Sequence, residues 1–242
     1  MARHRVRMAG RFRGFSVWAA LTLLLGSAFP AVAESPSSVP SRLQFQNSAP
    51  AGPGFAPDFL ERLLRHRDNV DFRFRDRILS PLSEPDRQSF QGLDYFDPEP
   101  ELALTALFER AGDRSVFAMP TYDRRTLRYS HFGTFTTALG EQRVQLKAFR
   151  REEEDGRRDL LLVPFRDATN GSETYAGGRY IELSLPLPDA PVLDFNRAMN
   201  PLCAYDPSYA CPIPPPENRL SVPIRAGEKQ YPGEPRSLTT RS

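Results

Sequence analysis

The sequence predicts a mainly β protein, an antiparallel β-sandwich or barrel-like sheet preceded by an N-terminal α-helix. Two observations carry this prediction. Apolar residues alternate with polar residues over several stretches after Gly92, and turn sequences of the hairpin type join some of these stretches. The chain also holds 24 prolines in 242 residues, a content that favours loops and sheet edges over a helical bundle.

The first 33 residues have the order of a Sec-type signal peptide. The segment contains no acidic residue, and its five arginines all precede an apolar run from Phe15 to Leu25. Ala31-Val32-Ala33 then offers the small residues that a signal peptidase reads. The apolar run is too short for a comfortable membrane span, and no later segment approaches that length. We expect cleavage after Ala33 and a periplasmic or extracellular protein; an uncleaved N-terminal anchor is the alternative.

Removal of the signal changes the charge balance. The whole chain has a net charge of +2, whereas residues 34–242 hold 27 basic and 30 acidic residues. Because this remainder is close to neutral, the composition predicts no nucleic-acid partner. After cleavage, no membrane span is expected either.

The remaining chain is expected to consist of a leader, one domain and a tail. Residues 34–56 are rich in Ser, Pro, Ala and Gly, which predicts a flexible leader. A single globular domain is expected over residues 57–229, and residues 230–242 are expected to form a disordered tail.

The predicted helix begins where Asp58 and Glu61 resemble a capping box. Apolar residues at helical spacing then continue past Val70, and Ser80-Pro81 is expected to end the helix. A second short helix is expected to start at Ser83-Glu84-Pro85-Asp86.

The predicted strands follow in order along the chain. They occupy residues 102–109, 127–139, 144–148, 160–165, 179–185, 192–195 and 219–226. Gly140-Glu141 fits a tight two-residue turn, and Asp155-Gly156 is a strong signal for a turn that needs positive φ. Short turns between successive strands imply antiparallel pairing.

Several motifs carry a family resemblance. They are His66-Arg67-Asp68, Ser80-Pro81-Leu82, the stretch 90–96, Cys203-Ala204-Tyr205 with Cys211-Pro212, and the stretch 216–220. With these motifs, residues 57–229 resemble the bacterial and archaeal family catalogued as domain of unknown function 1684. The resemblance implies domain limits and no activity.

The two cysteines, Cys203 and Cys211, predict a disulfide in an exported protein. The alternatives are metal binding and redox chemistry. Two thiols without a nearby His or a second cysteine pair make a poor zinc site, and redox pairs are more often spaced Cys-x-x-Cys.

Oxygen-bearing side chains are dense between Asp167 and Glu173, around Gly171. A hard cation such as calcium uses side chains of this kind, but the spacing does not match the twelve-residue calcium loop. A polar turn joining two strands is the preferred interpretation. We expect no metal and no cofactor, since the sequence holds no nucleotide-binding loop and no His-Glu-x-x-His motif. The absence of a Gly-x-Ser-x-Gly motif argues against nucleophilic catalysis.

Charged and aromatic residues between positions 165 and 229 suggest a polar pocket for a small anionic or polar ligand. The candidate ligand-binding residues are Asp167, Glu173, Tyr175, Arg179, Asp194, Asn196, Asn218 and Glu228. Arg179 is the central candidate, because it follows Gly177-Gly178 and starts a predicted strand.

Two other hypotheses remain open at this point. A carboxylate-dependent hydrolase or lyase of the cell envelope would use two of the four acidic candidates. A structural or interaction protein would instead pair these charges with each other in the interior. An open cleft lined by the candidates would favour the first two hypotheses over the third.

Overall fold

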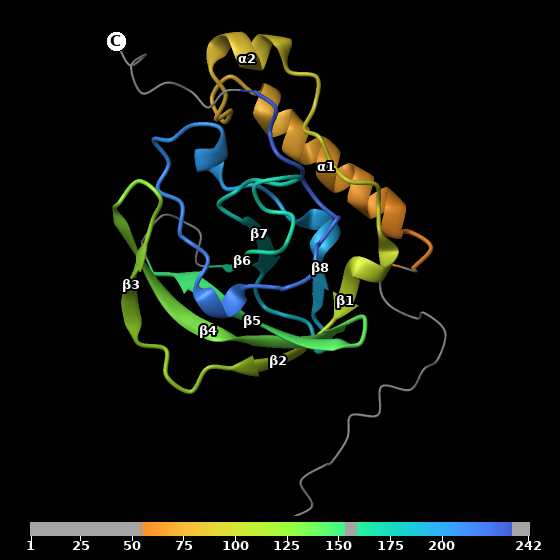
Figure 1. Cartoon of the computed structure of the whole chain (residues 1–242), viewed down its shortest axis with the longest axis vertical. Coiled ribbons are helices and arrows are strands. Elements are labelled where there is room, and N and C mark those ends of the chain that lie inside the picture. Colours follow the sequence, from red (N-terminus) through yellow and green to blue (C-terminus); the bar gives the residue numbers. More distant parts are fainter. Residues whose placement is uncertain (1–53, 55, 153–158, 234–242) are drawn as a thin grey trace, which may run out of the picture. The chain divides into compact units, whose positions relative to one another are not determined.

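The computed structural model describes residues 54, 56–152 and 159–233, all within one compact unit, Asn47–Ser242. Most of the regular structure is antiparallel β-sheet, and one long helix precedes the strands (Figure 1). The predicted fold class is confirmed, and the sheets are not closed into a barrel. The signal, most of the leader, the Asp155-Gly156 turn and most of the tail lie outside the described residues.

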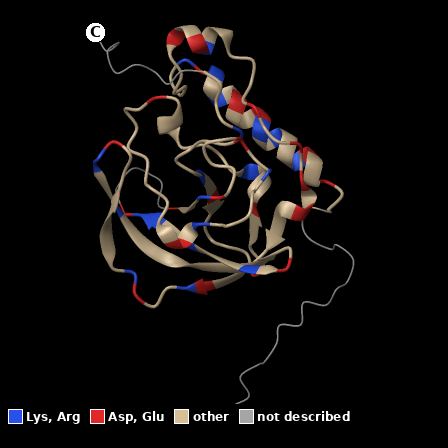
Figure 2. Cartoon of the chain, viewed as in Figure 1, with Lys and Arg blue, Asp and Glu red and all other residues tan. Residues whose placement is uncertain are grey.

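Helix α1 spans Phe59–Arg75 and has one apolar face. Phe59 and Leu63 pack against strand residues of the smaller sheet, and Val70 and Phe74 pack around Tyr205. Basic and acidic side chains alternate along its solvent side (Figure 2). The burial of this face, rather than helix propensity alone, holds α1 on the domain.

The ends of α1 differ from the prediction. The side chain of Asp58 makes no capping hydrogen bond and pairs instead with Arg62. The helix ends at Arg75 rather than at Ser80, because the Asp76 carboxylate accepts the N–H groups of Ile78 and Leu79 and turns the chain. The predicted second helix is confirmed as α2, Glu84–Ser89, with Ser83 accepting the N–H of Asp86.

Two sheets carry the strands. The smaller sheet pairs β1 with β8, and the larger one has the order β2-β4-β5-β6-β7, with β3 also on β4. The strands are β1 Ala103–Thr105, β2 Leu107–Arg110, β3 Val116–Pro120, β4 Thr126–Leu139, β5 Gln142–Arg151, β6 Leu160–Phe165, β7 Arg179–Ser184 and β8 Val192–Asp194. Short 3₁₀ turns cover Pro100–Leu102 (η2), Phe195–Arg197 (η3), Leu202–Ala204 (η4) and Pro216–Asn218 (η5).

Three strand predictions need correction. The stretch 102–109 is divided at Ala106, whose N–H bonds to Pro191, so its halves join different sheets. Strand β3 was not predicted, because most of it is exposed and it shows no alternation. Residues 219–226 form no strand; they make one isolated bridge, at Arg219, and then bend.

The β4–β5 hairpin is the longest pairing in the sheet. Its turn is the predicted Gly140-Glu141, with φ of +59° at Gly140, the conformation that glycine adopts without strain. Leu139 and Gln142 flank this turn as partners. The main core lies on one face of this hairpin and of β6, around Phe135, Leu146 and Leu161.

Strands β5 and β6 separate soon after they meet. Among the described residues, they pair at Phe149↔Leu162 and Arg150↔Leu161, and the same register, continued two residues beyond Phe149↔Leu162, would oppose Lys147 to Pro164. Proline has no N–H to donate across this step. The sheet forks here, and the fork forms one end of the site described below.

Candidate functional site

The side chain of Arg179, at the start of β7, lies wholly in the interior with 0% exposure. Its guanidinium donates to Asp167 Oδ2 at 3.0 Å, to the carbonyls of Ile224 at 2.7 Å and Ala226 at 2.5 Å, and to that of Glu228 at 3.2 Å. Burial lowers the pKa of Arg179, and the ion pair with Asp167 opposes this effect. The arginine therefore ties a non-strand segment to the sheet.

Asp167 is the partner that balances this charge. Its Oδ1 accepts the N–H of Thr169 at 2.9 Å, the hydroxyl of Thr169 at 2.6 Å and the N–H of Ile224 at 3.1 Å. Both carboxylate oxygens are thus bonded to protein groups. Further hydrogen bonds, among them Gly171 N–H to Thr174 O at 2.8 Å, close the loop as a polar turn.

Glu228 is a second buried carboxyl group, with 2% exposure. It accepts the N–H and the side-chain amide of Asn200, each at 2.8 Å, and contacts the hydroxyl of Tyr205 closely. Burial raises the pKa of Glu228 to about 8, against the opposing hydrogen bonds from Asn200 and the charge of Arg179. The carboxyl group is therefore largely protonated at neutral pH.

The other acidic and amide candidates lie apart from this cluster. Glu173 forms a surface ion pair with Arg225 at 2.8 Å, and this contact lowers the pKa of Glu173. Asp194 and Asn196 bond to each other at 2.9 Å, and Asn196 also bonds to both backbone groups of Glu99. Burial raises the pKa of Asp194. These two residues hold the segment before β1 against β8.

Cys203 and Cys211 are buried side by side. The N–H of Cys203 donates to Sγ of Cys211 at 3.1 Å, and the two thiols are free in this structure. The hydroxyl of Tyr175 lies 4.0 Å from Sγ of Cys203, and Tyr180 packs in the same cluster. Tyr175 thus belongs to the cysteine cluster rather than to that of Arg179.

Asn218 fills the fork between β5 and β6. Its side-chain amide donates to the carbonyls of Lys147 at 2.8 Å and Pro164 at 2.7 Å, and its Oδ1 accepts the N–H of Lys147 at 2.8 Å. The amide therefore replaces the missing donor of Pro164 and completes the hydrogen bonds of Lys147. Asn218 is fully buried, and its two neighbours in the chain, Glu217 and Arg219, line a groove.

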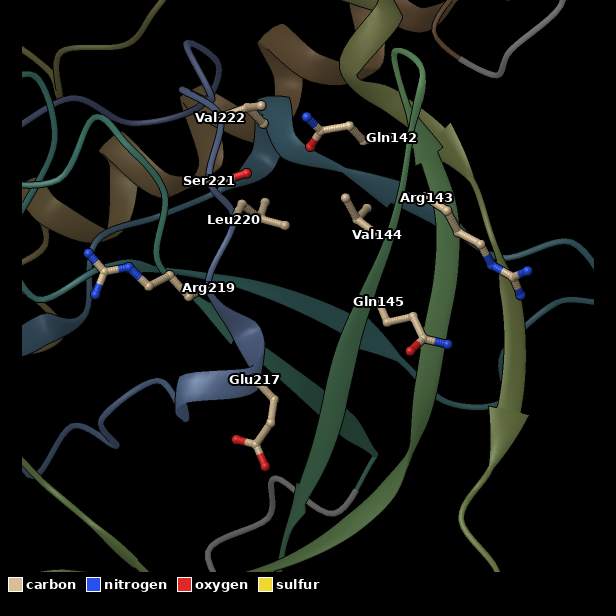
Figure 3. Close-up of a pocket in the computed structure, with 9 residues that line it drawn as sticks. All are labelled: Gln142, Arg143, Val144, Gln145, Glu217, Arg219, Leu220, Ser221 and Val222. Carbon is tan, nitrogen blue, oxygen red and sulfur yellow. The ribbon is translucent and has the colours of Figure 1, made fainter.

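The groove lies between the first half of β5 and the segment that follows η5 (Figure 3). Its volume is about 490 Å³. The side chains of Val144 and Leu220 approach each other across it, and Gln142 and Ser221 lie at the end away from Glu217. Arg143 and Arg219 point away from it in opposite directions. Of the predicted residues, none lines this groove, although Asn218 borders it.

The structure thus brings Asp167, Arg179 and Glu228 together in the interior rather than in a cleft. Sequence reasoning missed the groove, because backbone separation rather than reactive side chains creates it. The available signal was Pro164 inside a predicted strand, which marks a missing ladder donor. None of the described helices is long and apolar enough to cross a membrane, and the described residues contain no acidic, His or Cys group arranged to hold a metal ion.

Comparison with known proteins places this architecture in a family. The chain is similar to an uncharacterised protein of Haloarcula marismortui, solved by solution NMR, with 38% sequence identity and a TM-score of 0.57. The match covers 71% of this chain and 94% of that one. No curated protein matches the sequence. A family model described as "Protein of unknown function (DUF1684)" matches residues 88–229, and the chain belongs to this family.

Proposed function

We propose that the chain is an exported binding protein and that a small polar ligand binds in the groove beside β5. The observation that carries this proposal is the groove itself, whose volume of about 490 Å³ lies in the range of small-molecule sites. Its walls combine apolar side chains with the polar groups of Gln142 and Ser221. This mixture is common in ligand sites.

The Arg179 cluster supports a ligand site less well. Arg179, Asp167 and Glu228 are buried, and their polar groups are bonded mainly to the protein itself. The same burial weighs against a hydrolase or lyase, because a catalytic carboxyl group must reach its substrate. A binding role at the groove needs no such access to the interior.

A solute screen by NMR tests the binding role. Mature protein labelled with ¹⁵N is titrated with polar metabolites, sugars and short peptides, and amide shifts are mapped. We expect a binding solute to move the amides of residues 142–145 and 219–222. Ser221→Trp should fill the groove and weaken binding at least tenfold, whereas Ser184→Trp, on an exposed residue of β7, should leave it unchanged. Shifts confined to other regions, or no binding solute at all, would contradict the proposal.

Export is the second part of the proposal. The charged, apolar and small-residue order of residues 1–33 supports it. N-terminal sequencing of protein from the cell envelope should give a chain that begins at Glu34. A chain that still begins near Met1 would favour the uncleaved anchor.

A disulfide between Cys203 and Cys211 is the third part. The two groups already lie in contact in the interior, and an oxidising compartment favours their pairing. Closing so short a loop stabilises the fold by about 2–3 kcal/mol on the chain-entropy model. The intact mass should rise by about 2 Da on reduction, as expected for the gain of two hydrogens by one disulfide. Thiols that react with a label in unreduced, denatured envelope protein would contradict the pairing.

A further inference from the structure

The edge of β5 along the groove has open backbone groups. The two-residue turn makes Leu139 and Gln142 a hydrogen-bonded pair, and bonded pairs then alternate along the hairpin. By this alternation Arg143, Gln145 and Lys147 direct their N–H and C=O groups away from β4. The bonds from Lys147 to Asn218 confirm the direction at that residue.

The outward N–H and C=O groups of Lys147 are hydrogen-bonded to Asn218, whereas those of the other two outward residues, Arg143 and Gln145, are not. Within the described part of the chain, the N–H and C=O groups of Arg143 and Gln145 have no hydrogen-bond partner on this side. These four groups lie two residues apart on one strand, as on the edge of an incomplete sheet. They face the groove, since both residues line it.

The opposite wall of the groove, at Arg219, also has backbone groups without a hydrogen-bond partner among the described residues. Arg166 donates to Asn218 O at 2.9 Å and accepts from Leu220 N–H at 2.8 Å, as in a parallel ladder. In such a ladder the residue between these two, Arg219, directs its own N–H and C=O away from Arg166. No described residue bonds to these groups.

The side chains at the groove favour an uncharged strand over an ionic ligand. Val144 and Val222 are partly buried and pack on the main core, and Leu220 belongs to it. No labelled charged side chain points between them, because Arg143 and Arg219 turn outward (Figure 3). The floor therefore suits alternate apolar side chains, and the edge suits a peptide backbone.

We infer that the groove binds an extended polypeptide segment of another protein, which adds to the edge of β5 as a strand at Arg143 and Gln145. Main-chain hydrogen bonds would hold the segment, and alternate apolar side chains would lie on Val144 and Leu220. The added strand would end at Lys147, where Asn218 already occupies the edge. This inference rests on the proposed binding role of the groove, and it names a peptide segment, a class included in the solute screen, as the ligand in place of a small polar solute.

N-methylated peptides test the backbone contacts. The probe is a fluorescein-labelled peptide, Glu-(Val-Thr)₃-Glu, compared with one version N-methylated at the Val residues and another at the Thr residues. In a strand these two sets of amides face opposite edges, so each version blocks one edge. We expect the parent to shift the amides of Arg143 and Gln145, and at least one methylated version to bind tenfold or more weakly. Equal binding of all three peptides would overturn the inference.

A pair of variants tests the same contact from the protein side. Gln145→Pro removes the outward N–H, and Gln145→Thr keeps it; both lose the side-chain bond to Thr136. Since the affected N–H does not bond to β4, proline is compatible with this position. We expect at least tenfold weaker binding of the parent peptide by the proline variant and less than a twofold change for the threonine variant. Equal affinities in two folded variants would contradict strand addition, and if the proline variant fails to fold, the methylated peptides still decide.

The result also separates this inference from the binding function on which it rests. If a non-peptide solute shifts residues 142–145 and the peptide shifts none, strand addition is wrong and the groove remains a ligand site. If neither peptide nor solute binds, both proposals fail.

Discussion

The interior around Arg179 and the groove beside β5 differ in whether backbone groups outside the sheet ladder find a hydrogen-bond partner. Residues 224–228 form no strand, yet the guanidinium of Arg179 donates hydrogen bonds to three of their carbonyls, those of Ile224, Ala226 and Glu228. At the fork, the amide of Asn218 does the same for Lys147 and Pro164. Two residues before Lys147 in β5, the backbone groups of Gln145 that face away from β4 have no such partner among the described residues.

The difference shows which polar residues are structural and which region is open to a ligand. A buried polar side chain whose bonding positions are mostly filled by protein groups, as at Arg179, where Nε alone of the guanidinium nitrogens has no partner among the described residues, stabilises the fold and has little capacity left for a ligand. Unfilled backbone groups beside an apolar hollow have that capacity. The following substitutions test this contrast, beginning with the largest expected effect.

Loss of the Arg179 guanidinium is expected to give the largest effect. Arg179→Met keeps an apolar stem but leaves the Asp167 carboxylate unpaired in the interior, together with three carbonyls. Breaking a buried pair in this way costs about 3–5 kcal/mol. Urea unfolding should show this loss, whereas Arg225→Met, which removes an exposed pair with Glu173, should cost about 1 kcal/mol or less. Similar values for both variants would mean that the Arg179 cluster is not a structural centre.

Loss of the Asn218 side chain is expected to give the second-largest loss of stability. Asn218→Ala leaves the N–H and C=O of Lys147 and the carbonyl of Pro164 without their present partner. Since each buried orphan group costs about 1–3 kcal/mol and some of these groups gain water, we expect a net loss of about 3 kcal/mol. Thermal and urea unfolding check this value. Asn69→Ala, on the exposed side of α1, is the control and should change stability by less than about 0.5 kcal/mol.

The sequence predicted which strands and residues form the interior better than it predicted how those residues contact one another. The alternation after Gly92 predicted β4, β5 and β7, because half-buried strands follow a period of two. Asp167, Arg179 and Glu228 were three of the eight candidates predicted for one pocket, and the structure brings these three together in the interior. Their burial was not predictable, because the groups that enclose Arg179 are carbonyls of residues 224–228, and any sequence supplies carbonyls.

The predicted strand at 219–226 failed for the same reason. Its residues alternate as in a strand, but after Arg219 the carbonyls of Ile224 and Ala226 accept from Arg179 rather than from a neighbouring strand. A tertiary contact from a side chain thus overrides the local pattern. Pro164 was the one sequence signal for the fork, and it lies within an apolar run that otherwise predicts an uninterrupted strand.

Glu228 gives a smaller, pH-dependent effect. Its pKa is about 8 in the folded protein, above the ordinary value of 4.5, so the folded state binds the proton more tightly than the unfolded state. Stability from this group is therefore present at low pH and is lost as the pH rises toward and through 8. We expect the melting temperature of the wild type to fall between pH 6.5 and 8.5 relative to that of Glu228→Gln.

His66 also titrates, because burial lowers its pKa to about 4 from an ordinary value of 6.5, but both proteins contain it and its contribution cancels in the comparison. Glu217→Gln is the matched control: the bond to Lys147 lowers the pKa of Glu217, so this group stays charged in both states across the window. A difference between wild type and Glu228→Gln that does not change with pH would contradict the raised pKa.

The smallest effect on stability is expected at the two arginines that border the groove. Arg143 and Arg219 are exposed, and their side chains make no ion pair or hydrogen bond to another described residue. Arg143→Ala and Arg219→Ala should therefore each change the unfolding free energy by less than about 0.5 kcal/mol, in contrast to the buried Arg179. Their backbone groups remain, so binding of the alternating peptide should persist, with a modest loss that grows at low salt because its two glutamates lie near a positive rim. If either alanine variant abolished binding at physiological salt, the guanidinium groups rather than the β5 edge would hold the ligand, and the site would be an anion site of the kind first expected around Arg179.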